Sequence, residues 1–206
     1  MISARTAVFP GDVPFSRATS LSFEQGHHLT LSAITTTLHI GAHTDAPVHY
    51  HADGAGMNAR PLELYLGACQ VIQVKLPRGE RILPSHFSEK IEAPRVLFRT
   101  DSFPNPDRWN NDFNSLSPEL VEFLASAGVK LVGIDSPSVD PADSKGLESH
   151  QAIYRADLAV LEGIILNQVK PGLYTLIALP LALKDADASP VRAILLEKKE
   201  SFHEIR

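Results

Sequence analysis

The eleven-residue stretch from His39 to His49, HIGAHTDAPVH, contains three histidines and one aspartate. All four residues (His39, His43, Asp45 and His49) stand at odd-numbered positions, so an extended chain would present them on one face. Imidazole and carboxylate groups are common ligands of zinc, and a fourth group beside them can carry a proton. The spacing therefore predicts a metal site, with a polar strand edge bearing coincidental histidines as the alternative.

The backbone of this stretch must bend if its side chains are to reach one ion. In a straight strand, residues i and i+4 are about 13 Å apart at roughly 3.3 Å per residue. Gly41 and Pro47 are the residues that allow a bend. A helix is disfavoured because Gly41, Thr44 and Pro47 all oppose it. We expect a metal site on a bent strand or on a strand that runs into a loop.

The rest of the chain alternates expected strands with expected helices, which predicts an α/β fold, or α+β, with a mixed β-sheet and flanking helices. Ser117, Pro118 and Glu119 open a helix that Gly128 ends, and residues 130–134 follow as a buried strand. This strand–helix–strand order predicts parallel pairing. The other expected elements are strands at 29–38, 71–76, 96–100, 173–179 and 191–196 and a helix at 147–157.

Composition limits the possible functions. The 206 residues, 44% of them hydrophobic and 21% charged, suit one globular domain spanning 1–206. The net charge of −5 and the lack of a basic cluster argue against a nucleic-acid partner. Met1 is followed by no long apolar run, so we expect neither a secretory signal nor a membrane span. Cys69 is the single cysteine, which excludes an internal disulfide and fits a reducing cytoplasm. Residues 197–206 are expected to form a solvated, charged tail.

A second group of polar residues follows the strand at 130–134. Asp135 and Asp140 lie in the segment DSPSVDP, at the end of a strand where α/β proteins place their sites. Aspartates that precede proline commonly cap turns, and we favour that role for both.

His150 and Glu162 are the next candidates along the chain. Glu162 lies in the apolar run 158–166, and a buried carboxylate needs a compensating charge, which a metal ion supplies. Together with Asp45 as a bridge, the two residues would complete a second ligand set. The sequence leaves two alternatives open: a solvated helix histidine at His150, and a buried salt bridge at Glu162, for instance to Arg155.

Five blocks of sequence, in order from Phe9 to Arg192, resemble the cyclase-type metal-dependent hydrolases, and within them the bacterial kynurenine formamidases. One block is the His39–His49 motif, and the others are FPGDVPF, GIDSPSVDP, LEG and DASPVR. The resemblance implies a fold of the swivelling β/β/α type and a homodimer. It also implies two divalent metal ions, zinc or else manganese, with His39, His43 and Asp45 at one and Asp45, His150 and Glu162 at the other.

The same resemblance assigns His49 as the general acid/base and Phe9 as a substrate-binding residue. Phe9 stands where the formamidases usually carry tryptophan, so an aromatic face remains but an indole N–H donor is lost. The implied reaction is hydrolysis of N-formyl-L-kynurenine to L-kynurenine and formate. The alternatives are hydrolysis of a cyclic amide such as isatin, or of another small aryl amide, and a metal-binding homologue without catalysis. Trp109, as a pocket wall or a loop anchor, and His51, beside the motif, stay unassigned.

Overall fold

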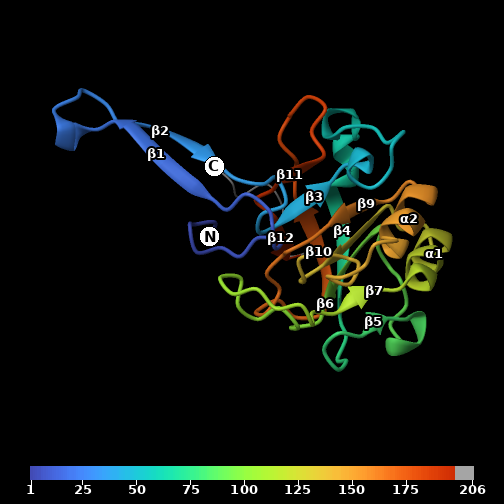
Figure 1. Ribbon diagram of the computed structural model, residues 1–206. Helices are drawn as coiled ribbons and strands as arrows, with labels where there is room; N and C mark the ends of the chain where they lie inside the picture. Colours follow the sequence, from blue (N-terminus) through green and yellow to red (C-terminus); the bar gives the residue numbers. More distant parts are fainter. Residues whose placement is uncertain (198–206) are drawn as a thin grey trace.

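The computed structural model describes residues 1–197; the expected charged tail lies outside this range except for Glu197. A mixed sheet of six strands forms the centre of the molecule (Figure 1). Four strands run parallel, and two at one edge run antiparallel to their neighbours. In spatial order the strands are β12 (Ile194–Glu197), β10 (Gly172–Ile177), β4 (Leu66–Gln73), β6 (Arg95–Arg99), β8 (Leu131–Ile134) and β9 (Ala159–Leu161).

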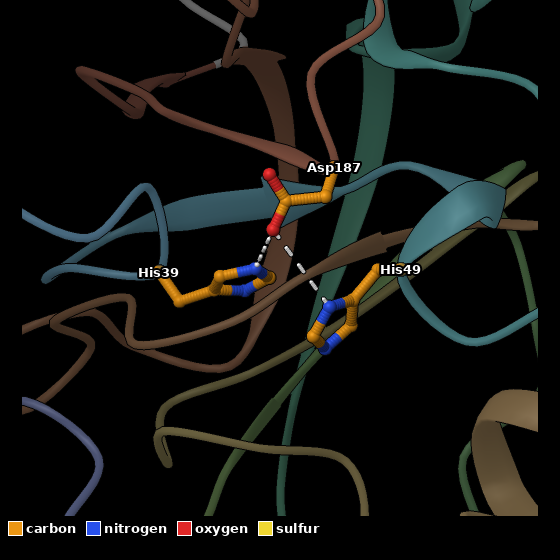
Figure 2. A group of neighbouring side chains, drawn as sticks. All are labelled: His39, His49 and Asp187. Atoms are coloured by element: carbon orange, nitrogen blue, oxygen red, sulfur yellow. Dashed lines mark hydrogen bonds and ion pairs between the residues drawn. The ribbon is translucent and has the colours of Figure 1, made fainter. Parts of the chain in front are cut away.

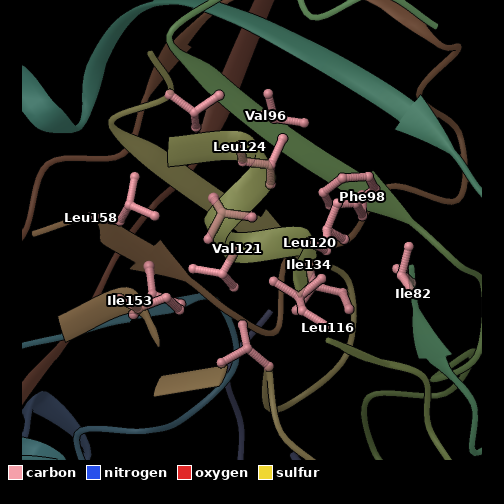
Figure 3. Close-up of a cluster of buried hydrophobic side chains, with 14 of the residues drawn as sticks. Ile82, Val96, Phe98, Leu116, Leu120, Val121, Leu124, Ile134, Ile153 and Leu158 are labelled. Atoms are coloured by element: carbon pink, nitrogen blue, oxygen red, sulfur yellow. The ribbon is translucent and has the colours of Figure 1, made fainter. Parts of the chain in front are cut away.

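The central strands are apolar on both faces because both faces are covered. Val71 and Leu97 belong to one buried cluster, whereas the next residues, Ile72 and Phe98, belong to the other. Helices α1 (Pro118–Ser126) and α2 (Glu148–Arg155) contribute to the cluster of Ile72 and Phe98, so both helices cover the same face (Figure 3). A buried side chain of this size contributes about 1.5–3 kcal/mol relative to an exposed one.

Helix α1 begins and ends as its sequence predicts. The Ser117 hydroxyl accepts a hydrogen bond from the Leu120 N–H at 3.1 Å. Gly128 follows with a φ of +81°, which glycine adopts without strain. Strands β6 and β8, on either side of this helix, are parallel neighbours, so the predicted strand–helix–strand unit is confirmed.

A hairpin of β1 (Ser16–Leu21) and β2 (Leu31–Thr35) projects from the body of the molecule (Figure 1). The prediction of one strand over 29–38 leading into the motif is wrong in its extent, because the strand spans only Leu31–Thr35 and ends before the motif. Its partner in the structure is β1. Threonine and branched residues indicate a strand, but they do not specify its partner.

Two further short strand pairs complete the fold. Strand β3 (His43–Asp45) pairs antiparallel with β11 (Ala188–Pro190), and β5 (Arg81–Ile82) pairs parallel with β7 (Ser115–Leu116). The predicted α/β class with a mixed sheet is confirmed. Over residues 1–197, no helix has the length and apolar character needed to cross a membrane.

Candidate metal centre and active site

The His39–His49 segment bends at the two predicted residues. Gly41 has a φ of +58°, and Pro47 begins a 3₁₀ turn that ends at His49. Only His43–Asp45 is extended, as strand β3. The expected bent strand is therefore correct, but turns on both sides of β3, rather than one extended face, bring the four side chains together.

The first predicted ligand set comes together around Asp45. Its Oδ1 lies 2.9 Å from His39 Nδ1 and 3.5 Å from His43 Nε2. The Gly41 carbonyl lies 2.9 Å from His43 Nδ1 and accepts its proton, which directs Nε2 into the site. His39, His43 and Asp45 thus offer three ligand atoms within 4.8 Å of one another.

The second predicted set shares Asp45 with the first. Asp45 Oδ2 lies 3.3 Å from His150 Nε2, and Glu162 Oε1 lies 3.5 Å from the same nitrogen. An antiparallel bridge between the backbones of His43 and Glu162 places the glutamate beside the motif. Glu162 Oε2 then lies 3.2 Å from His43 Nε2. The two oxygens of Asp45 therefore face different histidines, as a bridging carboxylate requires.

The donor atoms of this cluster fit a divalent metal ion. His43 Nε2 and Asp45 Oδ1 are buried, and neither has a hydrogen-bond partner of suitable geometry among residues 1–197. Leaving a buried polar atom unpaired costs about 1–3 kcal/mol, so such atoms are rare in folded proteins. Both atoms belong to the groups that zinc prefers as ligands. A cation between them would satisfy both.

The electrostatics of the cluster also favour a cation. Burial acts to raise the pKa of Asp45, but the nearby His150 and His39 hold that pKa well below its usual range. The pKa of Glu162 is lowered as well, because His150 and His43 outweigh its burial and the charge of Asp45. Two ionised carboxylates away from water need positive charge nearby.

His49 belongs to neither of these two sets, although with His39 and Asp187 it forms a third group whose possible ligand atoms lie within 4.8 Å of one another. Its side chain is 34% exposed, and its ring centroid lies 4.1 Å from that of His39. Burial lowers the pKa of His49, which favours the neutral imidazole, the form that can accept a proton.

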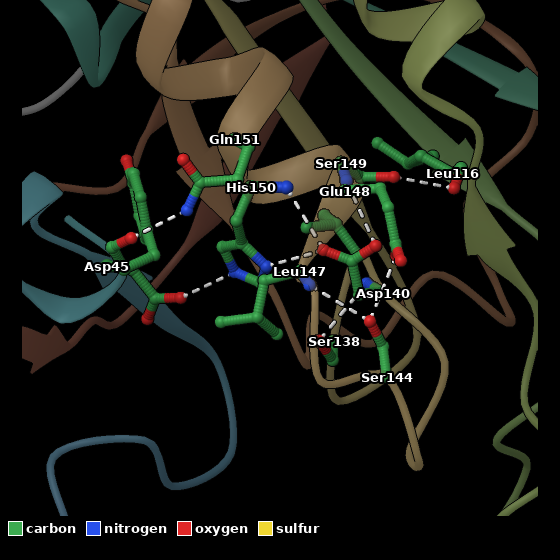
Figure 4. A network of polar contacts seen from close by, with 12 residues as sticks. Asp45, Leu116, Ser138, Asp140, Ser144, Leu147, Glu148, Ser149, His150 and Gln151 are labelled. Atoms are coloured by element: carbon green, nitrogen blue, oxygen red, sulfur yellow. Dashed lines mark hydrogen bonds and ion pairs between the residues drawn. The ribbon is translucent and has the colours of Figure 1, made fainter.

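The ring of His150 is held by Asp140, a contact that sequence reasoning missed (Figure 4). The predicted capping role is correct: Asp140 accepts the backbone N–H groups of Ser149 and His150 at the start of α2. In addition, Asp140 Oδ2 lies 2.8 Å from His150 Nδ1, and Arg81 binds Oδ1 at 3.0 Å. His150 therefore presents Nε2 to Asp45.

Asp187 is a second residue whose place in the site was missed. It precedes β11, and its Oδ2 lies 2.8 Å from His39 Nε2 and 3.9 Å from His49 Nδ1 (Figure 2). The available signal was its position at the head of DASPVR, one of the five blocks that carry the family resemblance.

A cavity of about 670 Å³ opens onto these residues. Phe9 and Trp109 line it, with their ring centroids 4.9 Å apart in an edge-to-face arrangement. Trp109 is both pocket wall and loop anchor, since its indole N–H donates to Asn111 Oδ1 at 2.6 Å. The cavity is large enough for a small aromatic substrate.

The contacts of the downstream residues bear on the alternatives, and Glu162 faces His43 and His150 at 3.2 and 3.5 Å. His150 is buried rather than solvated, and Arg155 contacts Glu122 at 3.5 Å instead of Glu162. Asp135 fits the turn role, because its carboxylate accepts the backbone N–H groups of Thr100 and Asp101. His51 stacks on Tyr154 with ring centroids 3.8 Å apart, which indicates a packing role.

Comparison with known proteins shows the family of the chain. The family model described as "Putative cyclase" matches residues 2–141, more than half of the chain. The kynurenine formamidase of Bordetella avium (strain 197N) is 47% identical over 198 residues, covering 95% of this chain and 94% of that protein. A solved structure of a potential metal-dependent hydrolase with cyclase activity superimposes with a TM-score of 0.82 at 25% identity, covering 97% of this chain and 96% of that one. Isatin hydrolase A from Labrenzia aggregata has a TM-score of 0.77 at 21% identity, covering 95% of this chain and 90% of that one, which shows a shared fold alone. The resemblance inferred from the five blocks is confirmed, and the chain belongs to the cyclase family.

Proposed function

We propose that this chain is an arylformamidase that hydrolyses N-formyl-L-kynurenine to L-kynurenine and formate, a step of tryptophan breakdown. One observation supports the reaction type: a partly exposed histidine, His49, stands beside two possible ligand sets that share Asp45 and is a member of neither. The choice of substrate rests on the 47% identity to a kynurenine formamidase over 95% of the chain.

In this proposal two divalent ions occupy the cluster. His39, His43 and Asp45 hold one ion, and Asp45, His150 and Glu162 hold the other. Bound ions of this kind polarise a carbonyl group and lower the pKa of water from 15.7 to about 7. Imidazole and carboxylate ligands suit zinc, with manganese as the alternative. Metal analysis of the purified protein tests both the identity and the number of ions.

The protein's own groups then move the proton. His49 Nδ1 faces Asp187, which leaves Nε2 free to take a proton from the attacking water. The water oxygen bonds to the formyl carbon, and the C–N bond then breaks. As it breaks, His49 Nε2 returns the proton to the departing aryl amine. Protonation is needed because an anilide anion is a poor leaving group.

We propose that Phe9 binds the aryl ring of the substrate. It lines the cavity, its side chain is partly exposed, and Trp109 supports it edge-on. Stacking on a benzene ring carries no donor requirement, so the substrate class does not depend on the indole N–H that Phe9 lacks.

Replacing Phe9 by alanine tests this role. The Phe9→Ala variant is expected to show a KM for N-formyl-L-kynurenine raised about 3–10-fold, because an aromatic pair contributes about 0.5–1.5 kcal/mol. Phe9→Trp is the matched control and should keep KM near its original value. Steady-state kinetics measure both KM values, and an unchanged KM in the alanine variant would show that Phe9 does not bind the substrate.

The alternative functions would use the same site, and assays with different substrates distinguish them. Hydrolysis of isatin or of another aryl amide would show as turnover of that compound in preference to N-formyl-L-kynurenine. A non-catalytic homologue would bind metal and release no formate. The free His49 argues against this last alternative, because structural zinc sites are closed by four protein ligands.

We propose a homodimer as the solution state. The projecting hairpin supports this, because Leu31 and Ile34, 54% and 63% exposed, lie on opposite faces of a strand that a second copy would cover. A dimer should show a molecular mass about twice the 22.5 kDa of one chain in light scattering. A mass of one chain would contradict the proposal.

We further propose one family domain over 1–206 and a cytoplasmic location. The match to a relative over 95% of the chain supports the single domain. The cytoplasmic location is supported by Cys69, a free and buried cysteine that leaves no internal disulfide to form, as suits a reducing compartment. Cell fractionation tests the location, and recovery outside the cytoplasm would contradict it.

A further inference from the structure

Asp187 contacts both a proposed metal ligand and the proposed acid/base without belonging to either metal set. The imidazole of His39 lies between two carboxylates, with Nδ1 2.9 Å from Asp45 Oδ1. On the other side of the ring, Nε2 is 2.8 Å from Asp187 Oδ2 (Figure 2). The two contacts use different ring nitrogens, so they can form together. One side of the ring faces the buried cluster, and the other faces a carboxylate that is half exposed.

The position of Asp187 is fixed by the same strand pair that carries the ligands. The Ala46 N–H donates to the Asp187 carbonyl at 2.8 Å. The following residue, Ala188, is the register partner of Asp45 across β11 and β3. The carboxylate therefore sits on a backbone that is held against the metal-site backbone, so its approach to His39 does not depend on a free loop.

We propose that Asp187 is a positioning residue for the ion at His39, His43 and Asp45. It accepts the Nε2 proton of His39, and this fixes the tautomer that offers the Nδ1 lone pair to the metal. Carboxylates bound to the second nitrogen of a ligating histidine orient the ring and raise its basicity. The inference rests on the proposed metal site but not on the choice of substrate.

At the proposed second metal site, a carboxylate also holds a ligating histidine, but that carboxylate is buried. Asp140 holds His150 Nδ1 at 2.8 Å, is fully buried, and is itself bound by Arg81. Asp187, by contrast, has a side chain that is 50% exposed, and solvent weakens its contact with His39. It follows that the His39 site is the weaker of the two and releases its ion first.

Stepwise metal binding tests the proposal. Metal-free full-length protein is titrated with zinc against a chromophoric chelator, in the absence of substrate. We expect two binding constants, and we expect Asp187→Asn to weaken only the weaker one, by about 10–100-fold. Asp187→Glu should recover part of the loss. Because the side chain is half exposed, the thermal unfolding midpoint of the metal-free variant should match that of the unsubstituted protein.

Asp185→Asn is the matched control. Asp185 is an exposed carboxylate two residues away with a φ of +54°, a backbone conformation that asparagine tolerates, and both binding constants should stay unchanged. The inference is overturned if Asp187→Asn leaves both constants unchanged or weakens them equally. It is also overturned if His49→Ala weakens the same constant as Asp187→Asn, because Asp187 would then be a ligand together with His39 and His49.

The outcomes separate this inference from the proposed function. A protein that takes up no metal would overturn both. A protein that binds two ions, loses affinity at one through Asp187→Asn and yet releases no formate would contradict the proposed substrate alone.

Discussion

An Asp45→Asn variant is expected to lose one metal ion, to hold the other less tightly, and to lose nearly all turnover. Asn keeps the shape of the side chain but replaces one oxygen by an NH₂ group, which cannot bind a metal. Because Asp45 faces His39 and His43 with one oxygen and His150 with the other, either orientation of the amide breaks one ligand set and weakens the shared bridge. Losing several kcal/mol of charge stabilisation corresponds to a fall in kcat of about 10²–10⁴-fold.

Metal analysis and kinetics on the same preparation check this expectation. Asp53→Asn is the control, because Asp53 is an exposed carboxylate eight residues along the chain. It should keep full metal content and activity. An Asp45→Asn protein with two ions and unimpaired turnover would show that Asp45 does not bridge them.

The second large effect is expected at His49. The His49→Ala variant should keep its metal content, since His49 belongs to neither proposed set, and should lose about 10²–10⁴-fold in kcat, as removal of a positioned proton carrier does. Its side chain is partly exposed, so the substitution leaves no closed cavity that would unfold the protein.

His51→Ala provides a matched control of the same residue type two positions away. His51 stacks on Tyr154, so this variant should lose a little stability and keep its kcat. Normal turnover by a His49→Ala protein with full metal content would show that His49 is not the general acid/base. Loss of metal from that protein would make His49 a ligand instead.

Local sequence signals predicted the parts of the site that depend on local structure. Gly41 and Pro47 indicated the bends in the His39–His49 segment, and both bends are present. Ser117 and Gly128 indicated the limits of α1 for the same reason: a cap and a left-handed glycine act within one turn of the chain.

Local sequence patterns could not predict the contacts between distant segments of the chain. Asp187 reaches His39 across 148 residues because β11 pairs with β3, and nothing in a three-residue strand specifies that partner. Likewise, the residues of β2 indicated a strand, but they did not indicate that this strand pairs with β1 in a separate hairpin. For Glu162 the sequence predicted burial beside a positive partner, because a carboxylate in an apolar run requires one, and the residue is buried against His43 and His150.

The most direct test of the proposed function is hydrolysis of N-formyl-L-kynurenine by metal-analysed protein, following formate and L-kynurenine together. The proposal predicts two divalent ions per chain, release of both products in equal amounts, and faster turnover than with isatin. Metal-loaded protein that releases no formate, or that turns over isatin in preference, would contradict it.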